Sequence, residues 1–210
     1  MHKDIPLIKE WLSTGSINIF GLPFSGKDTV GIRLAEELGA KFLSSGLILR
    51  AAEKKDIDLA KEMGAGKLAD TNKFRDIVLP YLQRDDLRGY PLILSSVGRW
   101  IGEEQAVLEA AANGGHPIKA VLLLNISETV AKERWEMART VMDRGERSDD
   151  KDAIVLEERM KEFIEKTMPV IEVYKQYNLL VSVQATGDRE TVYNGVINAL
   201  AEHARQYMDD

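Results

Sequence analysis

A glycine-rich stretch near the N-terminus has the residue types that hold phosphate groups. Residues 21–29 read G-L-P-F-S-G-K-D-T, so the first glycine and the Gly26-Lys27 pair have the spacing of a phosphate-binding loop. Small residues let successive backbone N–H groups surround a polyphosphate, and the start of a following helix adds positive potential. Lys27 then supplies an ammonium group for the terminal phosphates. We therefore predict a phosphate-binding loop at residues 21–29.

The residues around this loop form alternating strand and helix patterns. Strands are predicted at 16–20, 41–43, 91–94, 121–124 and 179–183, and helices at 4–13, 30–38, 46–83 (broken at 64–66), 103–112, 127–142, 151–166 (continuing after Pro169) and 188–204. Continuous apolar runs such as 121–124 are typical of strands buried on both faces. The alternation predicts an α/β fold with a mostly parallel five-stranded sheet between helices. Right-handed crossovers should gather the loops at 21–29, 95–99, 125–127 and 184–187 at one edge of it.

Composition narrows the kinds of site that the chain can carry. It has no cysteine, which rules out disulfides, thiolate metal ligands and cysteine nucleophiles. It has 34 acidic and 28 basic side chains and a net charge of -6, so no overall basic field attracts nucleic acid. We see no signal peptide and no apolar run long enough to span a bilayer. We expect a single cytoplasmic domain, residues 1–210, with neither nucleic acid nor membrane as a partner.

The order of several motifs resembles that of adenylate kinases. The motifs are residues 21–29, Ser44-Ser45-Gly46 with Leu49-Arg50, the strand that leads to Gly98-Arg99, Arg147-x-Asp149-Asp150, and Arg159. The likeness runs from about residue 16 to residue 200. The chain therefore looks like a nucleoside monophosphate kinase with the P-loop three-layer sandwich fold. The resemblance implies a core of residues 16–45, 84–142 and 151–210, an acceptor-binding insertion at 46–83 and a short lid at 143–150.

The resemblance also implies an activity and the residues that carry it. The activity is Mg²⁺-dependent transfer of the γ-phosphoryl group of ATP to a nucleoside monophosphate, with AMP as first choice, by a monomer. The implied ATP-binding residues are Gly21, Pro23, Ser25, Gly26, Lys27, Asp28, Thr29, Arg134 and Gly187. The implied acceptor-binding residues are Ser45, Gly46, Arg50, Leu68, Gly98, Arg99, Glu103 and Gln105.

The expected catalytic residues are Lys27, Arg99, Arg147 and Arg159, with Arg144 as a second lid arginine. Guanidinium groups bind phosphate oxygens in a planar, bidentate way, and one such arginine can be worth several orders of magnitude in rate. No general base is needed, because the acceptor phosphate is already an anion. The enzyme has to align the reactants, neutralise charge and exclude water.

Two departures from the family concern the metal. Adenylate kinases have an Asp-Gly-aromatic-Pro-Arg run after the third strand, whereas this chain has Ser95-Ser96-Val97-Gly98-Arg99 and lacks that carboxylate. Asp28 stands where the family has Gly. A bare carboxylate beside a triphosphate repels it unless a cation lies between them. We hypothesise that Asp28 replaces the missing aspartate and, with Thr29, holds Mg²⁺ through water.

A third departure concerns the acceptor base. In adenylate kinases a Gln four residues after the strand-end Arg reads adenine, but here that position is Glu103 and the nearest Gln is Gln105. Gln105 would keep AMP as the acceptor. The carboxylate of Glu103 suits the N–H donors of guanine or the amino group of cytosine. GMP, CMP or a deoxynucleotide are thus alternative acceptors, and the missing aspartate leaves a nucleotide-binding protein with little catalysis as an alternative of another class.

Overall fold

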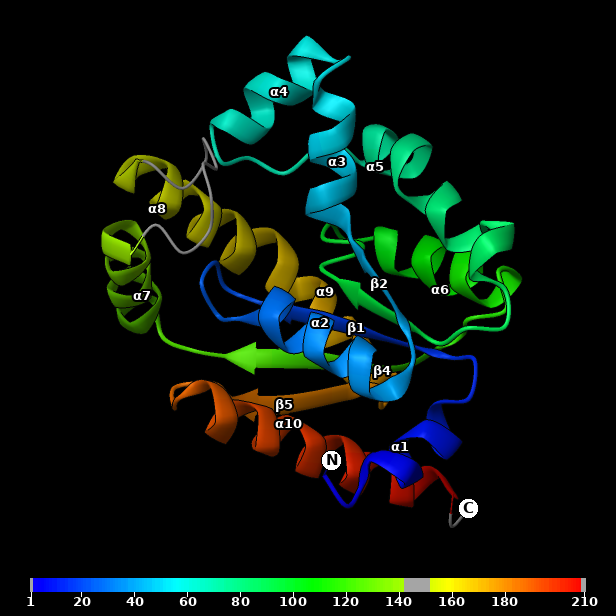
Figure 1. Cartoon of the computed structure of the whole chain (residues 1–210). Coiled ribbons are helices and arrows are strands. Elements are labelled where there is room, and N and C mark those ends of the chain that lie inside the picture. Colours follow the sequence, from blue (N-terminus) through cyan, green and yellow to red (C-terminus); the bar gives the residue numbers. More distant parts are fainter. Residues whose placement is uncertain (1, 142–151, 209–210) are drawn as a thin grey trace.

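A five-stranded sheet forms the centre of the computed structural model, which describes residues 2–141 and 152–208 (Figure 1). All pairings are parallel, and the strand order is β2-β3-β1-β4-β5. The strands are β1 Ser16–Gly21, β2 Lys41–Ser44, β3 Leu92–Ser95, β4 Ile118–Asn125 and β5 Leu180–Gln184. The predicted α/β fold and its sheet are confirmed. Every residue of β1 and β3 is buried, as expected for strands covered on both faces.

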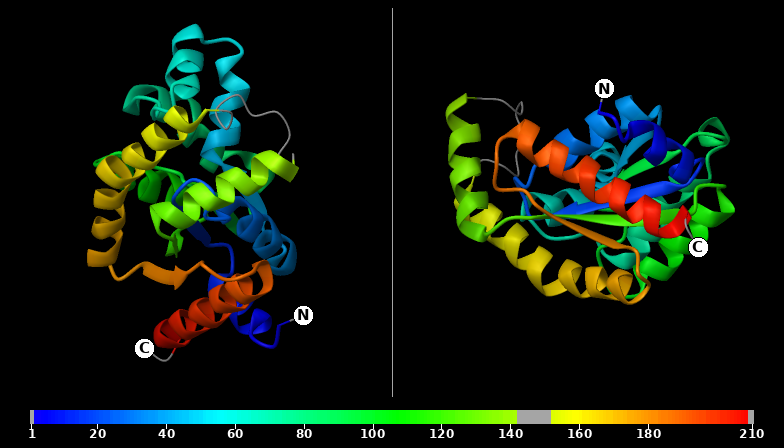
Figure 2. Two further views of the ribbon diagram at one scale, coloured as in Figure 1. Left: turned by 90° about the vertical axis from the view of Figure 1, so that its left-hand side faces the viewer. Right: turned by 90° about the horizontal axis from the view of Figure 1, so that it is seen from below.

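Helices cover both faces of this sheet. They are α1 Ile5–Leu12, α2 Lys27–Leu38, α3 Ser45–Glu53, α4 Ile57–Gly64, α5 Thr71–Ile77, α6 Glu103–Asn113, α7 Glu128–Val141, α8 Ala153–Glu162, α9 Met168–Gln176 and α10 Arg189–Met208, with short 3₁₀ turns at Leu79–Gln83 and Asp85–Leu87. Helices α2 and α10 lie on one face and α6 and α9 on the other (Figure 2). None of the described helices combines the length and apolar character needed to cross a membrane.

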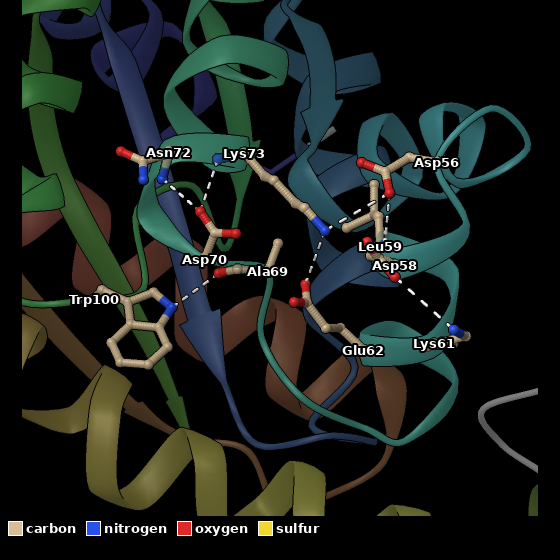
Figure 3. A network of polar contacts seen from close by, with 10 residues as sticks. All are labelled: Asp56, Asp58, Leu59, Lys61, Glu62, Ala69, Asp70, Asn72, Lys73 and Trp100. Carbon is tan, nitrogen blue, oxygen red and sulfur yellow. Dashed lines mark hydrogen bonds and ion pairs between the residues drawn. The ribbon is translucent and has the colours of Figure 1, made fainter.

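The predicted insertion, residues 46–83, contributes helices α3, α4 and α5, which stand together at one end of the molecule (Figure 1). The predicted break at 64–66 falls at the end of α4, and Asp70 caps α5 by accepting from the amides of Asn72 and Lys73. Within the insertion, Lys73 Nζ lies 3.7 Å from an oxygen of Asp56 and 3.5 Å from one of Glu62 (Figure 3). These contacts link Lys73 on α5 to α4 and to its N-cap residue, Asp56.

The structure corrects some expected element boundaries. We expected a helix from residue 46, but α3 begins at Ser45 and its N-cap is Ser44. The Ser45 hydroxyl is buried and donates instead to the carbonyl of Ser96, at 2.6 Å. Helix α2 begins at Lys27 rather than at residue 30. A π-helical turn, Phe163–Thr167, joins α8 to α9 without a gap, and Pro169 lies two residues beyond this turn.

The predicted lid, 143–150, lies outside the described residues together with Arg144 and Arg147.

Candidate functional site

The loop between β1 and α2 is built for close backbone packing. A Cβ atom at Gly21 would lie 2.5 Å from Ser25 Oγ and 2.9 Å from the Leu124 carbonyl oxygen, so only glycine fits there. Gly26 has φ +89°, a conformation that glycine adopts without strain, and α2 begins at the next residue. The Ser25 hydroxyl is buried without a hydrogen-bond partner in the described part of the chain. This strand–loop–helix geometry matches the predicted phosphate-binding loop.

Two pockets flank the loop. The first, named here the insertion pocket, lies between the loop, the insertion and the residues after β3. It brings together these predicted residues: Gly21, Pro23, Lys27, Asp28, Ser45, Gly46, Arg50, Leu68, Arg99, Glu103 and Arg159. The second, named the α10 pocket, has a volume of about 490 Å³ and lies between the loop, α7 and α10. Its lining includes the predicted residues Ser25, Gly26, Thr29, Arg134 and Gly187.

Cationic side chains gather in the insertion pocket. Burial and, second, the positive charge of Arg159 together lower the pKa of Arg99 to about 10, while Glu162 and Glu103 act in the opposite direction. The guanidinium of Arg50 folds back over Gly46, where an added Cβ would lie 3.1 Å from Nη2. Arg99 and Arg159 therefore repel one another, and an anion bound between them would weaken this repulsion. Such an arrangement favours binding of a phosphate.

Backbone and side-chain contacts hold Arg99 in place. Asn18, buried in the central strand, donates to the Val97 carbonyl at 2.7 Å and accepts from the Val97 amide at 3.2 Å. Gly98 follows with φ +77°, and a Cβ there would lie 2.8 Å from Val107 Cγ2. Gly98 thus shapes the turn but does not line the pocket. Arg99 Nε donates to Thr167 Oγ1 at 3.3 Å.

The structure separates the two residues proposed to read the acceptor base. Glu103 is 1% exposed and lines the insertion pocket, where its Oε2 accepts from the amides of Arg99 (2.7 Å) and Trp100 (3.0 Å). Burial raises the pKa of Glu103, although these two amides and the nearby Thr71 hydroxyl oppose the shift. Gln105 is exposed, donates to Glu109 at 3.1 Å and lies outside the pocket. Two residues apart on a helix is about 200° of rotation, so only one of them can face the pocket.

Sequence reasoning missed several residues of the insertion pocket and its wall, among them Trp100 and Glu162. Trp100 lines the pocket, donates from its indole nitrogen to the Ala69 carbonyl at 3.0 Å, and has Lys166 Nζ 4.1 Å from its ring centroid (Figure 3 shows the Ala69 contact). Glu162 accepts from the Leu68 amide at 3.1 Å and pairs with Lys166. The position of Trp100 directly after Arg99 was an available signal. No sequence signal pointed to Glu162, because a glutamate on a charged helix normally faces solvent.

On the other side of the loop, Arg134 joins two segments that are distant in sequence. Its guanidinium donates to the carbonyls of Ala185 (2.6 Å) and Gly187 (3.3 Å), and also to those of Phe24 and Ser25, both at 3.4 Å. Burial lowers the pKa of Arg134. It therefore fixes the loop after β5 against the phosphate-binding loop and shapes the α10 pocket.

The two predicted metal residues line different pockets. Asp28 lines the insertion pocket and Thr29 the α10 pocket. Ser95 donates to Asp28 Oδ1 at 2.6 Å. The described residues contain no group of three or more histidines or acids that could enclose a metal. One carboxylate with nearby hydroxyls fits a cation such as Mg²⁺, which keeps several waters and is held largely by substrate phosphates.

Known proteins resemble this chain in sequence and in fold. The family model described as "AAA domain" matches residues 20–168. Proteins named adenylate kinase, from Mycobacterium tuberculosis and Mycobacterium bovis, are 30% identical over 188 residues, which cover 88% of this chain and 98% of theirs. One from Synechococcus sp. is 31% identical over 185 residues, covering 86% of this chain and 96% of its own. A gluconokinase structure from Sinorhizobium meliloti 1021 has a TM-score of 0.61 at 21% identity, covering 93% and 96% of the two chains, and so shares the fold.

Proposed function

The chain belongs to the adenylate kinase-like P-loop kinases, and from this premise we propose that it transfers the γ-phosphoryl group of ATP to a nucleoside monophosphate, with AMP as first choice. The names of the relatives support the reaction. The chain's own residues support the division of labour between the two pockets. We also expect it to act as a monomer in the cytoplasm.

The observation that carries this proposal is the set of cations in the insertion pocket. Lys27, Arg50, Arg99 and Arg159 line one pocket that begins at the phosphate-binding loop. A neutral acceptor would not need so many cations, because like charges gathered in one pocket repel one another and are costly to bury. An acceptor that carries its own phosphate would neutralise them.

In the proposed reaction, Arg50 and Arg99 hold the acceptor phosphate, while the loop backbone and Lys27 hold the donor. An oxygen of the acceptor phosphate attacks the γ-phosphorus. The bond to the β–γ bridging oxygen breaks, and ADP leaves with that electron pair. Arg159, together with Arg147 from outside the described residues, stabilises charge on the transferring group. Mg²⁺ bound with ATP supplies further neutralisation at the phosphate oxygens.

The nucleoside parts of the two substrates would occupy opposite sides of the loop. The α10 pocket, with a volume of about 490 Å³, is large enough for a nucleoside and has Arg134 and Gly187 in its wall. Ser45, Gly46, Leu68 and Glu103 would surround the acceptor nucleoside in the insertion pocket.

The position of Glu103 favours a second candidate acceptor. Glu103 lines the insertion pocket whereas Gln105 does not. A carboxylate accepts hydrogen bonds from guanine N1–H and N2–H₂, or from the cytosine amino group. GMP, CMP or a deoxynucleotide is therefore the alternative acceptor class.

An acceptor panel tests both candidates. ADP formation from ATP and Mg²⁺ is followed by a coupled assay with AMP, GMP, CMP, their deoxy forms, gluconate or no acceptor. We expect turnover with one or more monophosphates and none above background with gluconate. Turnover with gluconate alone would contradict the proposal. ATP binding without turnover on any acceptor would instead favour a binding protein.

A further inference from the structure

A hydrogen bond joins the first turn of α2, which follows the phosphate-binding loop, to the last residue of β3. The Ser95 hydroxyl donates to Asp28 Oδ1 at 2.6 Å, across 67 residues of sequence. Ser95 is 1% exposed and Asp28 is half-buried, and both line the insertion pocket beside Lys27. The buried hydroxyl thus fixes the orientation of a carboxylate next to the site proposed for the donor phosphates.

The negative charge of a carboxylate at this position opposes binding of a triphosphate. Two negative charges a few ångströms apart repel, and the repulsion is stronger where surrounding protein excludes water. Asp28 sits directly after the lysine of the loop, so bound triphosphate would feel this charge. The hydrogen bond from Ser95 holds one oxygen of this carboxylate in place beside the loop. A cation between the carboxylate and the phosphates removes the conflict.

We propose that Asp28, oriented by Ser95, accepts hydrogen bonds from the water shell of the divalent cation that accompanies the donor triphosphate. This inference rests on the proposed function. Mg²⁺ dehydrates reluctantly and is commonly held by one or two carboxylates together with substrate phosphates. A single oriented carboxylate beside a phosphate-binding loop meets that requirement without an enclosing cluster of acids. Ser95 acts as a positioning residue for Asp28.

The first test measures ATP binding by calorimetry, with Mg²⁺ and with a chelator, in the full-length protein. Asp28→Asn keeps an oxygen to accept from Ser95 but loses the charge. We expect the Mg²⁺-dependent gain in ATP affinity to fall at least about tenfold, equivalent to about 1.4 kcal/mol. Metal-free ATP binding should stay equal or become tighter, because a repulsive charge has been removed. Glu36→Gln, an exposed change of the same charge on the same helix, should leave both affinities unchanged.

The second test moves the carboxylate from position 28 to position 95, its hydrogen-bond partner. Ser95→Asp in the Asp28→Asn background places the acid on β3 and the amide on α2. We expect this double variant to recover most of the Mg²⁺-dependent gain. Ser95→Ala alone, which removes this hydrogen bond to the Asp28 carboxylate, should lose part of the gain.

The outcomes separate this inference from the proposed function. If Asp28→Asn changes ATP affinity by the same factor with and without Mg²⁺, Asp28 has a structural role in the loop and the inference is wrong, while ATP binding still stands. Failure of the double variant to recover any gain, although its thermal unfolding matches that of Asp28→Asn, would also overturn it. If the unaltered protein binds no ATP, the proposed function and this inference both fall.

Discussion

Arg99 Nε donates to Thr167 Oγ1 at 3.3 Å, so an arginine after β3 is held by the π-helical turn between α8 and α9. Thr167 is 0% exposed. A hydrogen bond at Nε fixes the plane of a guanidinium group, and that plane decides how its terminal nitrogens can meet two oxygens of a phosphate. Single π-helical turns occur frequently at functional sites. Here the turn presents a hydroxyl to a pocket cation.

The first prediction concerns this contact. Thr167→Val keeps the shape of the side chain but removes the acceptor, and hydrogen bonds to charged groups are worth about 1.5–3 kcal/mol. We expect kcat/KM for the acceptor to fall on the order of tenfold, with KM for ATP within about twofold. Thr167→Ser should restore activity. Equal losses for both substrates in two-substrate initial-rate kinetics would show that Thr167 does not act through Arg99.

A second prediction uses Trp100 as a reporter of the insertion pocket. Trp100 lines that pocket, whereas the buried Trp11 packs against His203 on α10. Acceptor binding should change tryptophan fluorescence, and Trp100→Phe should remove most of the change while Trp11→Phe keeps it. Loss of the bond to Ala69 should also raise the acceptor KM about two- to tenfold. A full fluorescence change in Trp100→Phe would place the acceptor elsewhere.

A third prediction concerns the pH dependence of stability. Burial raises the pKa of Glu103 above its ordinary value of 4.5, so the native state holds a proton on this residue over a pH range in which the unfolded state does not. Stability from the protonated form is therefore lost as pH rises from about 4.5 through the native pKa. Glu103→Gln cannot ionise and can still accept from the amides of Arg99 and Trp100.

We therefore expect the difference in free energy of unfolding, Glu103→Gln minus unaltered protein, to increase as pH rises through this window. Above the window the difference should stay constant. Urea denaturation between pH 4 and pH 8 measures the difference. Glu109→Gln, on the exposed side of the same helix, corrects for the general effect of removing one acid. A difference that shrinks with rising pH would mean that the ionised carboxylate stabilises the fold.

The fold was predictable because its signals are local. Apolar runs and helical periodicity identified every strand and most helices, and the glycine-lysine spacing identified the phosphate-binding loop. Contacts between distant residues were not predictable. The bond from Trp100 to Ala69 spans 31 residues and that from Leu68 to Glu162 spans 94, and neither leaves a mark in local pattern. The bond from the Ser45 hydroxyl at the start of α3 likewise depends on the Ser96 carbonyl, which follows β3 and is 51 residues away in the sequence.

The central claim is that the insertion pocket takes the acceptor and the α10 pocket the donor. Arginine-to-lysine substitutions test it, because lysine keeps the charge but loses the planar fork. We expect Arg99→Lys to lower kcat/KM for the acceptor by about 100-fold with little change in ATP affinity, as for loss of one charge-stabilising donor. Arg134→Lys gives up bonds to four carbonyls and should raise the ATP KM about tenfold or more, with the acceptor KM within about threefold.

Arg84→Lys serves as the matched control, since Arg84 is an exposed arginine that binds Asp86 through two nitrogens outside both pockets. The most direct measurement is therefore a two-substrate initial-rate comparison of Arg99→Lys, Arg134→Lys and Arg84→Lys. The predicted result is a reciprocal pattern, in which the first variant affects the acceptor, the second affects ATP and the third affects neither. If Arg99→Lys and Arg134→Lys weaken both substrates equally, the assignment of the two pockets is contradicted.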